Sequence, residues 1–391
     1  MGQKKTMRVT LSNFLRLLLP TFALRSGPSS VLSQVWTIGT NRLLILALVA
    51  VQYASGQTNT SYPVGGPGPA GIAFDGTDIW VANYDGNTVT KLSPAGATIG
   101  TYTVGQNPCC IAFDGANIWV TSEDSNYVTK LRASTGVTVG IYPVGIDPEG
   151  VVFDGTYIWV ANANDNTVTK LLASTGASLG TYPVGVFFPT RLAFDGTSIW
   201  VTGYGGAVSK LLASTGAVVG TYPVAVGIPY GIAFDGTSIW VANSSSFTTN
   251  SPSSTVTKLQ TSTGALVGTY TVGNAPVGMA FDGTNMWVAN SGSGTLTKLL
   301  SSTGAMVGTY SVGSGPYGVV FDGTNIWVTN RGGNTVTKIV AASQAPHIYC
   351  LVASRRFTAR RKPSSQPNGC RFMAAILPTV PPYGTASFLL R

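Results

Sequence analysis

The sequence predicts an all-β protein in which residues 61–340 form a seven-bladed β-propeller of four-stranded antiparallel blades. Composition is the first reason: 48 Gly, 22 Pro and only 9% charged residues are typical of a turn-rich β protein. The second is a repeated Phe-Asp-Gly tripeptide, with intervals of 39, 40, 41, 40, 47 and 40 residues. Its aspartates are Asp75, Asp114, Asp154, Asp195, Asp235, Asp282 and Asp322. A period near forty with several short strands per unit is typical of propeller blades.

Four strands fit into each repeat, as the first one illustrates. The apolar run Gly71–Phe74 ends in an Asp-Gly dipeptide, which favours a tight hairpin turn to a second strand at Ile79–Ala82. Thr88–Leu92 is rich in β-branched residues and predicts the third strand, and the fourth lies around Ile99–Val104. Both faces of these strands carry apolar or Thr side chains, so we expect each sheet to be packed between two neighbouring blades.

The ends of the repeat array predict how the ring closes. An extra fourth strand, Ser61–Gly65, precedes the first repeat, and the last repeat stops after its third strand, Thr335–Ile339. If these two segments pair, the N-terminal strand completes the last blade and protects both open edges. The alternative is an open solenoid.

Charges and tryptophans that recur in every repeat are interpreted as structural. We expect each third-strand lysine to lay its aliphatic stem on the sheet with the ammonium at a blade edge. Each Phe-Asp-Gly aspartate is expected to stabilise the turn in which it lies. The repeat tryptophans, Trp80 to Trp327, are expected to pack between blades. The lysines are Lys91, Lys130, Lys170, Lys210, Lys258, Lys298 and Lys338.

The repeats also resemble a known family. Trp-Val-Ala-Asn, followed by Asn-Thr-Val-Thr-Lys-Leu and Tyr-Pro-Val-Gly, resembles the bacterial YVTN-type propeller repeats and, more broadly, the NHL and streptogramin-lyase-like propellers. Streptogramin-lyase-like relatives use histidines and a metal, as the resemblance implies. The only histidine here, His347, lies outside the repeats, so that activity does not carry over. One fold hosts many chemistries, and the resemblance therefore predicts the fold better than the function.

Acidic residues that do not repeat give the best functional clue. In a four-stranded blade, the loops leading into first strands and the loops joining second to third strands open on the same face, where the channel is reached; we call it the mouth face. Six of the seven unrepeated acids fall on this face, in the first three repeats, and only Asp78 belongs to the opposite face. The six are Asp85, Glu123, Asp124, Asp147, Glu149 and Asp165. Arg191, Arg331, Tyr230 and Tyr317 belong to the same face in other repeats and complete the expected site.

This acidic face favours a binding or interaction scaffold for a protein or a small polar or cationic ligand. No catalytic residue and no resident cofactor is predicted. One alternative is a divalent cation held by loop carboxylates, serving a lyase or hydrolase of the streptogramin-lyase-like or lactonase-like type, with Glu123 and Glu149 in adjacent repeats as paired carboxylates. A structural surface component is another. The vicinal Cys109 and Cys110 are expected to be small apolar residues filling a loop, with soft-metal binding as the alternative.

The net charge of +9 comes from the flanks. Residues 1–61 and 340–391 hold 13 basic residues and no acid, so the propeller region carries ten basic and 14 acidic residues and a net charge of −4. This balance argues against a nucleic-acid partner. We expect a monomer.

The flanks predict an extracytoplasmic protein. Residues 1–60 are an N-terminal extension in which Arg42, nine apolar residues and small residues up to Gly56 resemble a secretory signal. Membrane association is expected only if this segment stays uncleaved. Residues 341–391 are basic and Pro-containing, and their composition predicts a disordered tail.

Overall fold

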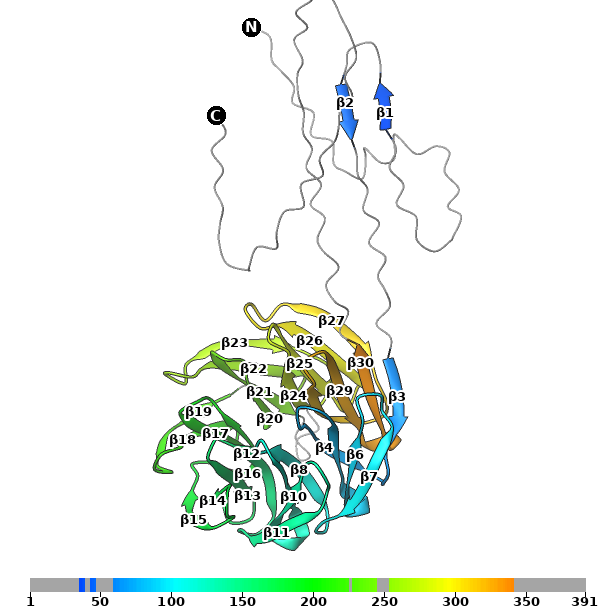
Figure 1. The fold of residues 1–391 in the computed structure, drawn as a ribbon. Coiled ribbons are helices and arrows are strands. Elements are labelled where there is room, and N and C mark those ends of the chain that lie inside the picture. Colours follow the sequence, from blue (N-terminus) through cyan, green and yellow to red (C-terminus); the bar gives the residue numbers. More distant parts are fainter. Residues whose placement is uncertain (1–34, 39–42, 47–58, 225–226, 245–252, 341–391) are drawn as a thin grey trace, which may run out of the picture. The chain divides into compact units, whose positions relative to one another are not determined.

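Seven four-stranded antiparallel sheets form the propeller in the computed structural model of the chain (Figure 1). The structure describes residues 35–38, 43–46, 59–224, 227–244 and 253–340. The described residues contain no α-helix, and among them no helix is long and apolar enough to cross a membrane. The fold class predicted from the repeats is confirmed.

Each blade contributes its first strand to the centre of the ring. Figure 1 shows these strands side by side around the middle of the propeller, and they are the strands that line its central channel. They are β4 (Pro69–Phe74), β8 (Pro108–Phe113), β12 (Pro148–Phe153), β16 (Phe187–Phe194), β20 (Ile228–Phe234), β24 (Pro276–Phe281) and β28 (Pro316–Phe321). They begin earlier than predicted, because the residues before the expected start already pair with the second strand across a β-bulge.

Second and third strands form the buried middle of each blade. The second strands are β5 (Ile79–Asn83), β9 (Asn117–Ser122), β13 (Tyr157–Asn162), β17 (Ser198–Tyr204), β21 (Ser238–Ser244), β25 (Asn285–Asn290) and β29 (Asn325–Asn330). The third strands are β6 (Thr88–Leu92), β10 (Tyr127–Arg132), β14 (Thr167–Leu172), β18 (Ala207–Leu212), β22 (Thr255–Gln260), β26 (Thr295–Leu300) and β30 (Thr335–Val340). Among the described parts of the loops between them, three hold short 3₁₀ turns: η1 (Tyr84–Gly86), η2 (Glu123–Ser125) and η3 (Arg331–Gly333).

Fourth strands form the outer rim. They are β7 (Thr98–Thr103), β11 (Thr138–Pro143), β15 (Ser178–Pro183), β19 (Val218–Pro223), β23 (Leu266–Thr271), β27 (Met306–Ser311) and β3 (Asn59–Pro63). Exposed and half-buried residues alternate along them, so the expectation that both faces of every strand are covered is wrong for the rim. The cause is position: a rim strand faces water where the blades splay apart.

The ring closes as predicted from the first and last repeats. β3 pairs antiparallel with β30, with Ser61 opposite Thr337 and Pro63 opposite Thr335. The last blade therefore combines the two ends of the domain, and its hydrophobic cluster joins Trp327 to Ile79 and Val81 of the first blade. An open solenoid is excluded by these contacts.

Repeated charges serve the fold at the face opposite the mouth, which we call the turn face. Asp75 accepts hydrogen bonds from the Thr77 and Asp78 amides through Oδ1 and from Trp80 Nε1 (2.8 Å) through Oδ2. Lys91 Nζ lies 5.2 Å from the Trp80 ring centroid and donates to the Ala133 carbonyl of the next blade. The lysine is thus nearly buried and joins two blades, whereas a position at a blade edge was expected.

All seven repeat tryptophans are fully buried in clusters that join neighbouring blades. Their indole N–H groups are bonded to the Phe-Asp-Gly aspartates and their faces are covered by the repeat lysines. The structural interpretation of these three repeated residue types is confirmed.

Outside the propeller, the described part of the N-terminal region is a two-stranded antiparallel hairpin of β1 (Val35–Ile38) and β2 (Leu43–Leu46). Strand β2 covers part of the predicted signal segment at 42–56. The rest of that segment, the tail at 341–391 and residues 245–252 of the fifth-blade insertion lie outside the described residues.

Candidate functional site at the channel mouth

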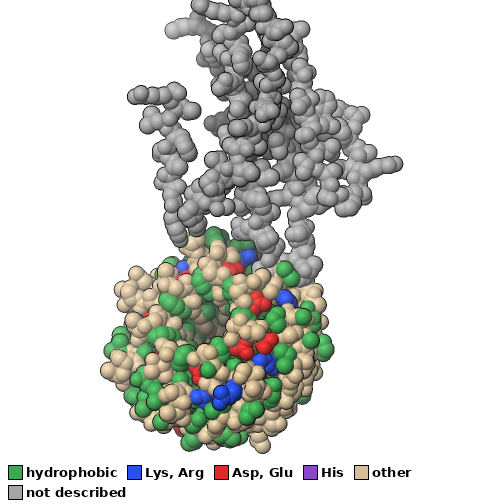
Figure 2. All heavy atoms as spheres, in the orientation of Figure 1, with side chains coloured by type: hydrophobic (Ala, Val, Ile, Leu, Met, Phe, Trp, Pro, Cys, Tyr) green, Lys and Arg blue, Asp and Glu red, His purple; other side chains and the backbone are tan. Residues whose placement is uncertain are grey.

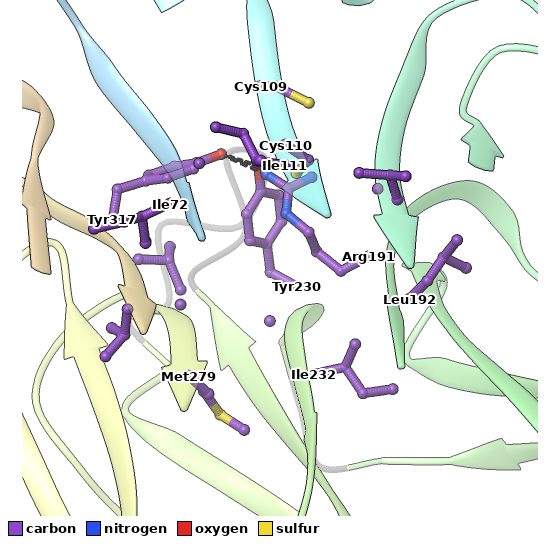
Figure 3. Close-up of a pocket in the computed structure, with 18 residues that line it drawn as sticks. Ile72, Cys109, Cys110, Ile111, Arg191, Leu192, Tyr230, Ile232, Met279 and Tyr317 are labelled. Carbon is purple, nitrogen blue, oxygen red and sulfur yellow. Dashed lines mark hydrogen bonds between the residues drawn. The ribbon is translucent and has the colours of Figure 1, made fainter. Parts of the chain in front are cut away.

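The central channel is lined by a ring in which two positions break the repeat. Five of the seven first strands contain Pro-x-Gly. A Cβ built on the glycine of the fifth blade, Gly231, would lie 1.7 Å from the Val277 carbonyl oxygen. Glycine is therefore needed where neighbouring first strands approach closely. Cys110 and Arg191 replace this glycine in the second and fourth blades. The channel encloses a cavity of about 160 Å³ beside them (Figure 3), and Figure 2 shows the ring hollowed near its middle.

Arg191 spans the channel. Its guanidinium pairs with the Glu149 carboxylate of the third blade and donates 2.8 Å hydrogen bonds to the hydroxyls of Tyr230 and Tyr317, in the fifth and seventh blades. The two tyrosine hydroxyls are hydrogen-bonded to each other, and the guanidinium lies 4.5 Å from the Tyr230 ring centroid. Figure 3 shows Arg191, Tyr230 and Tyr317 converging beside Cys110. These contacts occupy both terminal nitrogens of the arginine.

Glu149 also belongs to a second, mixed cluster. Cys109 Sγ and one carboxylate oxygen each of Glu123 and Glu149 lie within 4.8 Å of one another. Cys109 comes from β8, Glu123 opens η2, and Glu149 comes from β12, so three separate elements bring these groups together. Cys109 is 1% exposed and Glu149 is 8% exposed. The Cys109 thiol donates to the Glu149 carbonyl (3.1 Å), which also accepts from Thr121.

Glu123 lacks the cation that Glu149 has. Its carboxylate accepts a 2.5 Å hydrogen bond from the Tyr84 hydroxyl, and among the described residues no Lys or Arg nitrogen lies within ion-pair distance of it. Burial, together with the charge of Glu149, raises the pKa of Glu123 to about 7. Burial and the Glu123 hydrogen bond also hold the pKa of Tyr84 above its usual range.

The two thiols differ in environment. Burial and the contact with Cys110 raise the pKa of the Cys109 thiol well above its usual value. The hydrogen bond from Cys109 lowers the pKa of Cys110, against the effect of burial, and the charge of Arg191 acts in the same direction as that bond.

A stacked pair extends the cluster towards solvent. The Arg331 guanidinium lies 4.2 Å from the Tyr84 ring centroid and 4.0 Å from the Asp85 carboxylate. The Asp85 and Arg331 side chains are both exposed, so their mutual attraction is weak. The aromatic contact places Arg331 above Tyr84 on the mouth face.

The remaining acids of the mouth face lie in the loops around this cluster. Asp124 accepts from the Asn107 side chain, and Asp165 accepts a 2.7 Å bond from the Ile146 amide, so each also ties a leading loop in place. Asp147 precedes β12 with a left-handed backbone (φ 60°) that the Asn126 side chain fixes by accepting its amide. Burial and the charges of Glu149 and Asp124 raise the pKa of Asp147 to about 6.

The expected site therefore divides in two. Glu123, Glu149, Arg191, Tyr230 and Tyr317 converge at the channel, whereas the other expected residues lie on surrounding loops: Asp85, Asp124, Asp147, Asp165 and Arg331. Glu149 was expected in a loop but lies in β12, because the pairing of this strand with β13 already begins at Pro148.

Cys109 and Tyr84 belong to the site but were not in the expected set. Cys109 does not fill a loop: it is in β8, and its thiol faces two carboxylates. Aligning the repeats would have singled it out. The residue after the first-strand proline is Ala70, Cys109, Glu149, Thr190, Tyr230, Val277 and Tyr317. This column contains four of the six residues that meet at the channel or at the Cys109–Glu123–Glu149 cluster.

Comparison with known proteins supports the fold and goes no further. No protein-family model and no curated protein matches the chain. Among solved structures, Kuenenia stuttgartiensis hydrazine synthase is similar at 20% identity and a TM-score of 0.64, covering 75% of this chain and 99% of that one. Selenomethionine-substituted virginiamycin B lyase from Staphylococcus aureus is similar at 18% identity and a TM-score of 0.62, covering 72% and 99%.

A catalytically inactive variant of the same lyase, with quinupristin, gives 17% identity and a TM-score of 0.63, covering 72% of this chain and 99% of that one. At these identities the likeness shows the fold alone. The protein is thus a seven-bladed β-propeller with a charged, partly buried cluster at its channel mouth. The finer resemblance to YVTN-type or NHL repeats stays a prediction.

Proposed function

We propose that the protein is a binding propeller that recognises a basic segment of a protein partner on the mouth face of its second and third blades. The observation that carries this proposal is an excess of unpaired acid. Among the described residues, no Lys or Arg lies within ion-pair distance of Asp124, Asp147 or Asp165. Their combined potential favours a positively charged ligand.

Exposed apolar side chains beside these acids favour a peptide over a small amine. Ile146 is 52% exposed and directly precedes Asp147, and Phe187, 74% exposed, opens the first strand of the next blade. Large apolar groups bordered by charge are typical of protein-interaction surfaces. An extracytoplasmic location and a monomeric state belong to the same proposal; the first is supported by the apolar segment after Arg42.

The test compares two variants with the same change in net charge. Asp124→Asn, Asp147→Asn and Asp165→Asn together remove three negative charges from the mouth face. Leu212→Lys, Gln260→Lys and Val340→Lys add three positive charges at exposed positions on the turn face, equivalent to the natural Arg132. Binding of a fluorescent peptide of alternating lysine and leucine is measured by anisotropy at low salt.

We expect the mouth-face variant to bind about 10-fold more weakly, at roughly 0.5 kcal/mol for each exposed charge, and the turn-face variant to bind like the wild type. Equal losses in both variants would show a non-specific charge effect and overturn the proposal. Competition by spermidine at the same charge concentration distinguishes the ligands: effective competition would assign the site to small amines.

A second candidate is a hydrolase or lyase. It is favoured by one observation: Glu123 and Glu149 converge beside the channel, and the pKa of about 7 at Glu123 suits a general acid or base. Hydrolysis of a chromogenic lactone, with and without Mg²⁺, tests it. The enzyme hypothesis expects turnover that Glu123→Gln reduces by at least 100-fold; turnover that is unchanged in this variant contradicts it.

A further inference from the structure

We propose that Cys109, Glu123 and Glu149 form a binding site for a thiophilic divalent cation, with Zn²⁺ as the expected ion. This proposal concerns the buried cluster and is independent of the peptide surface formed by the outer acids. Its first support is geometry. One sulfur and two carboxylate oxygens, from three separate elements, already lie within 4.8 Å of one another. Ligands of a tetrahedral zinc ion lie roughly 3–4 Å apart, so small side-chain rotations bring the three atoms to bonding distance.

Charge is the second support. Two carboxylates and a thiol meet in a largely buried place, and among the described residues the only ion pair there joins Arg191 to Glu149. Among the described residues, Glu123 accepts a hydrogen bond from the neutral hydroxyl of Tyr84 and has no Lys or Arg within ion-pair distance. Buried charges are normally paired or bound to a metal. A divalent cation supplies the missing positive charge to Glu123 and Glu149 together.

The type of ligand atom selects the metal. A cysteine thiolate with two carboxylates suits Zn²⁺, whereas Mg²⁺ and Ca²⁺ prefer all-oxygen sites. Arg191 fixes the orientation of Glu149 and Tyr84 that of Glu123, as partners behind metal ligands commonly do. Three protein ligands leave one coordination position free, and Cys109 lines the channel cavity, which gives the ion access.

The repeat provides matched variants for the test. Cys109→Ala introduces the residue that the first blade carries at this position, Ala70. Cys110→Gly removes the neighbouring thiol and restores the glycine of five other blades, but leaves the proposed ligands intact. Because the full chain also carries Cys350, Cys370 and His347, the decisive quantity is the difference between these two variants.

Zn²⁺ binding to the full-length protein is measured by competition with a chromogenic chelator. We expect Cys110→Gly to match the wild type, and both Cys109→Ala and Glu123→Gln to lose one site or bind more than about 10-fold more weakly. Substitution with Co²⁺ gives a second readout: a thiolate-to-cobalt charge-transfer band that persists in Cys110→Gly and disappears in Cys109→Ala. Circular dichroism checks that each variant is folded.

Equal Zn²⁺ affinity in Cys109→Ala and wild type, or a cobalt spectrum without a thiolate band, would overturn the site. Loss of binding in Cys110→Gly alone would assign the ion to the other thiol and also reject the proposed ligand set. Peptide binding measured in the presence of a chelator separates the two proposals, since the outer acids do not require the ion.

Discussion

The two faces of this propeller use charge in opposite ways. On the turn face, each aspartate accepts hydrogen bonds from its own turn and its tryptophan, and the lysines cover the tryptophan rings. In six blades the lysine also donates to a turn carbonyl of the next blade. On the mouth face, Glu123 has no cation and three loop acids have none either, among the described residues. Charges that repeat therefore build the fold, whereas four unrepeated acids of the mouth face, Glu123, Asp124, Asp147 and Asp165, have no basic partner among the described residues and are left available for a ligand.

The largest expected difference in stability between the two faces comes from substituting a repeat tryptophan. Trp240 is fully buried, and Trp240→Ala leaves a large cavity between two blades and removes the indole donor of Asp235. We expect a loss of about 3–5 kcal/mol in the free energy of unfolding, measured by urea denaturation. Glu123→Gln, at the mouth, is expected to change it by less than about 1 kcal/mol at about pH 4, where this side chain is largely protonated in both the folded and the unfolded state. Similar losses in the two variants would remove the distinction between the faces.

The glycine ring gives the next contrast. A Cβ at Gly231 meets a backbone oxygen at 1.7 Å, so Gly231→Ala forces two first strands apart and should cost about 1–3 kcal/mol. Cys110→Gly restores the repeat at an equivalent position and should cost less than about 1 kcal/mol. Denaturant midpoints of the two variants measure this difference. A larger loss for Cys110→Gly would show that its thiol, not the close approach, dominates at the ring.

We expect low pH to destabilise the protein mainly by protonating the aspartates of the turn face. Burial opposes ionisation of Asp235, but hydrogen bonds from Ser301, Trp240 and Thr237 hold the pKa of its carboxyl well below the usual value. A depressed folded-state pKa contributes stability above the unfolded value of about 3.9, which is lost as the pH falls below it. The melting temperature should therefore fall steeply as the pH is lowered from about 5 to about 2. In Asp235→Asn, the melting temperature should depend less strongly on pH over this range. An unchanged slope in this variant contradicts the assignment.

The last prediction concerns Glu123 on the mouth face. Its titration should make stability change with pH in the direction opposite to that expected for Asp235. The pKa of Glu123, about 7, lies above the unfolded value of about 4.3, so its folded state holds a proton that the unfolded state has lost. Stability from this group is present below about pH 4 and is lost as the pH rises to about 7. Without added metal, Glu123→Gln should flatten the melting temperature between pH 5 and pH 7 relative to the wild type. An equally steep profile in the variant would place the effect on another group.

The repeat by itself determined the architecture. A forty-residue period with one Phe-Asp-Gly turn and one tryptophan per unit leaves few other folds, because every unit must bury the same apolar faces against its neighbours. The order of the chain ends also predicted the pairing of Ser61 with the last blade, since an orphan fourth strand and a missing fourth strand need each other. Which acids share the mouth face followed from strand order alone.

Tertiary structure decided which of those residues meet. Glu123 and Glu149 are in adjacent blades, but only the bulged start of β12 and the position of η2 bring their carboxylates to Cys109. Arg191 reaches Tyr317 across 126 residues because the ring places the fourth and seventh blades around one channel. Strand order specifies the face on which a side chain emerges, whereas distances across a channel depend on side-chain length, bulges and blade spacing, which no periodic pattern encodes.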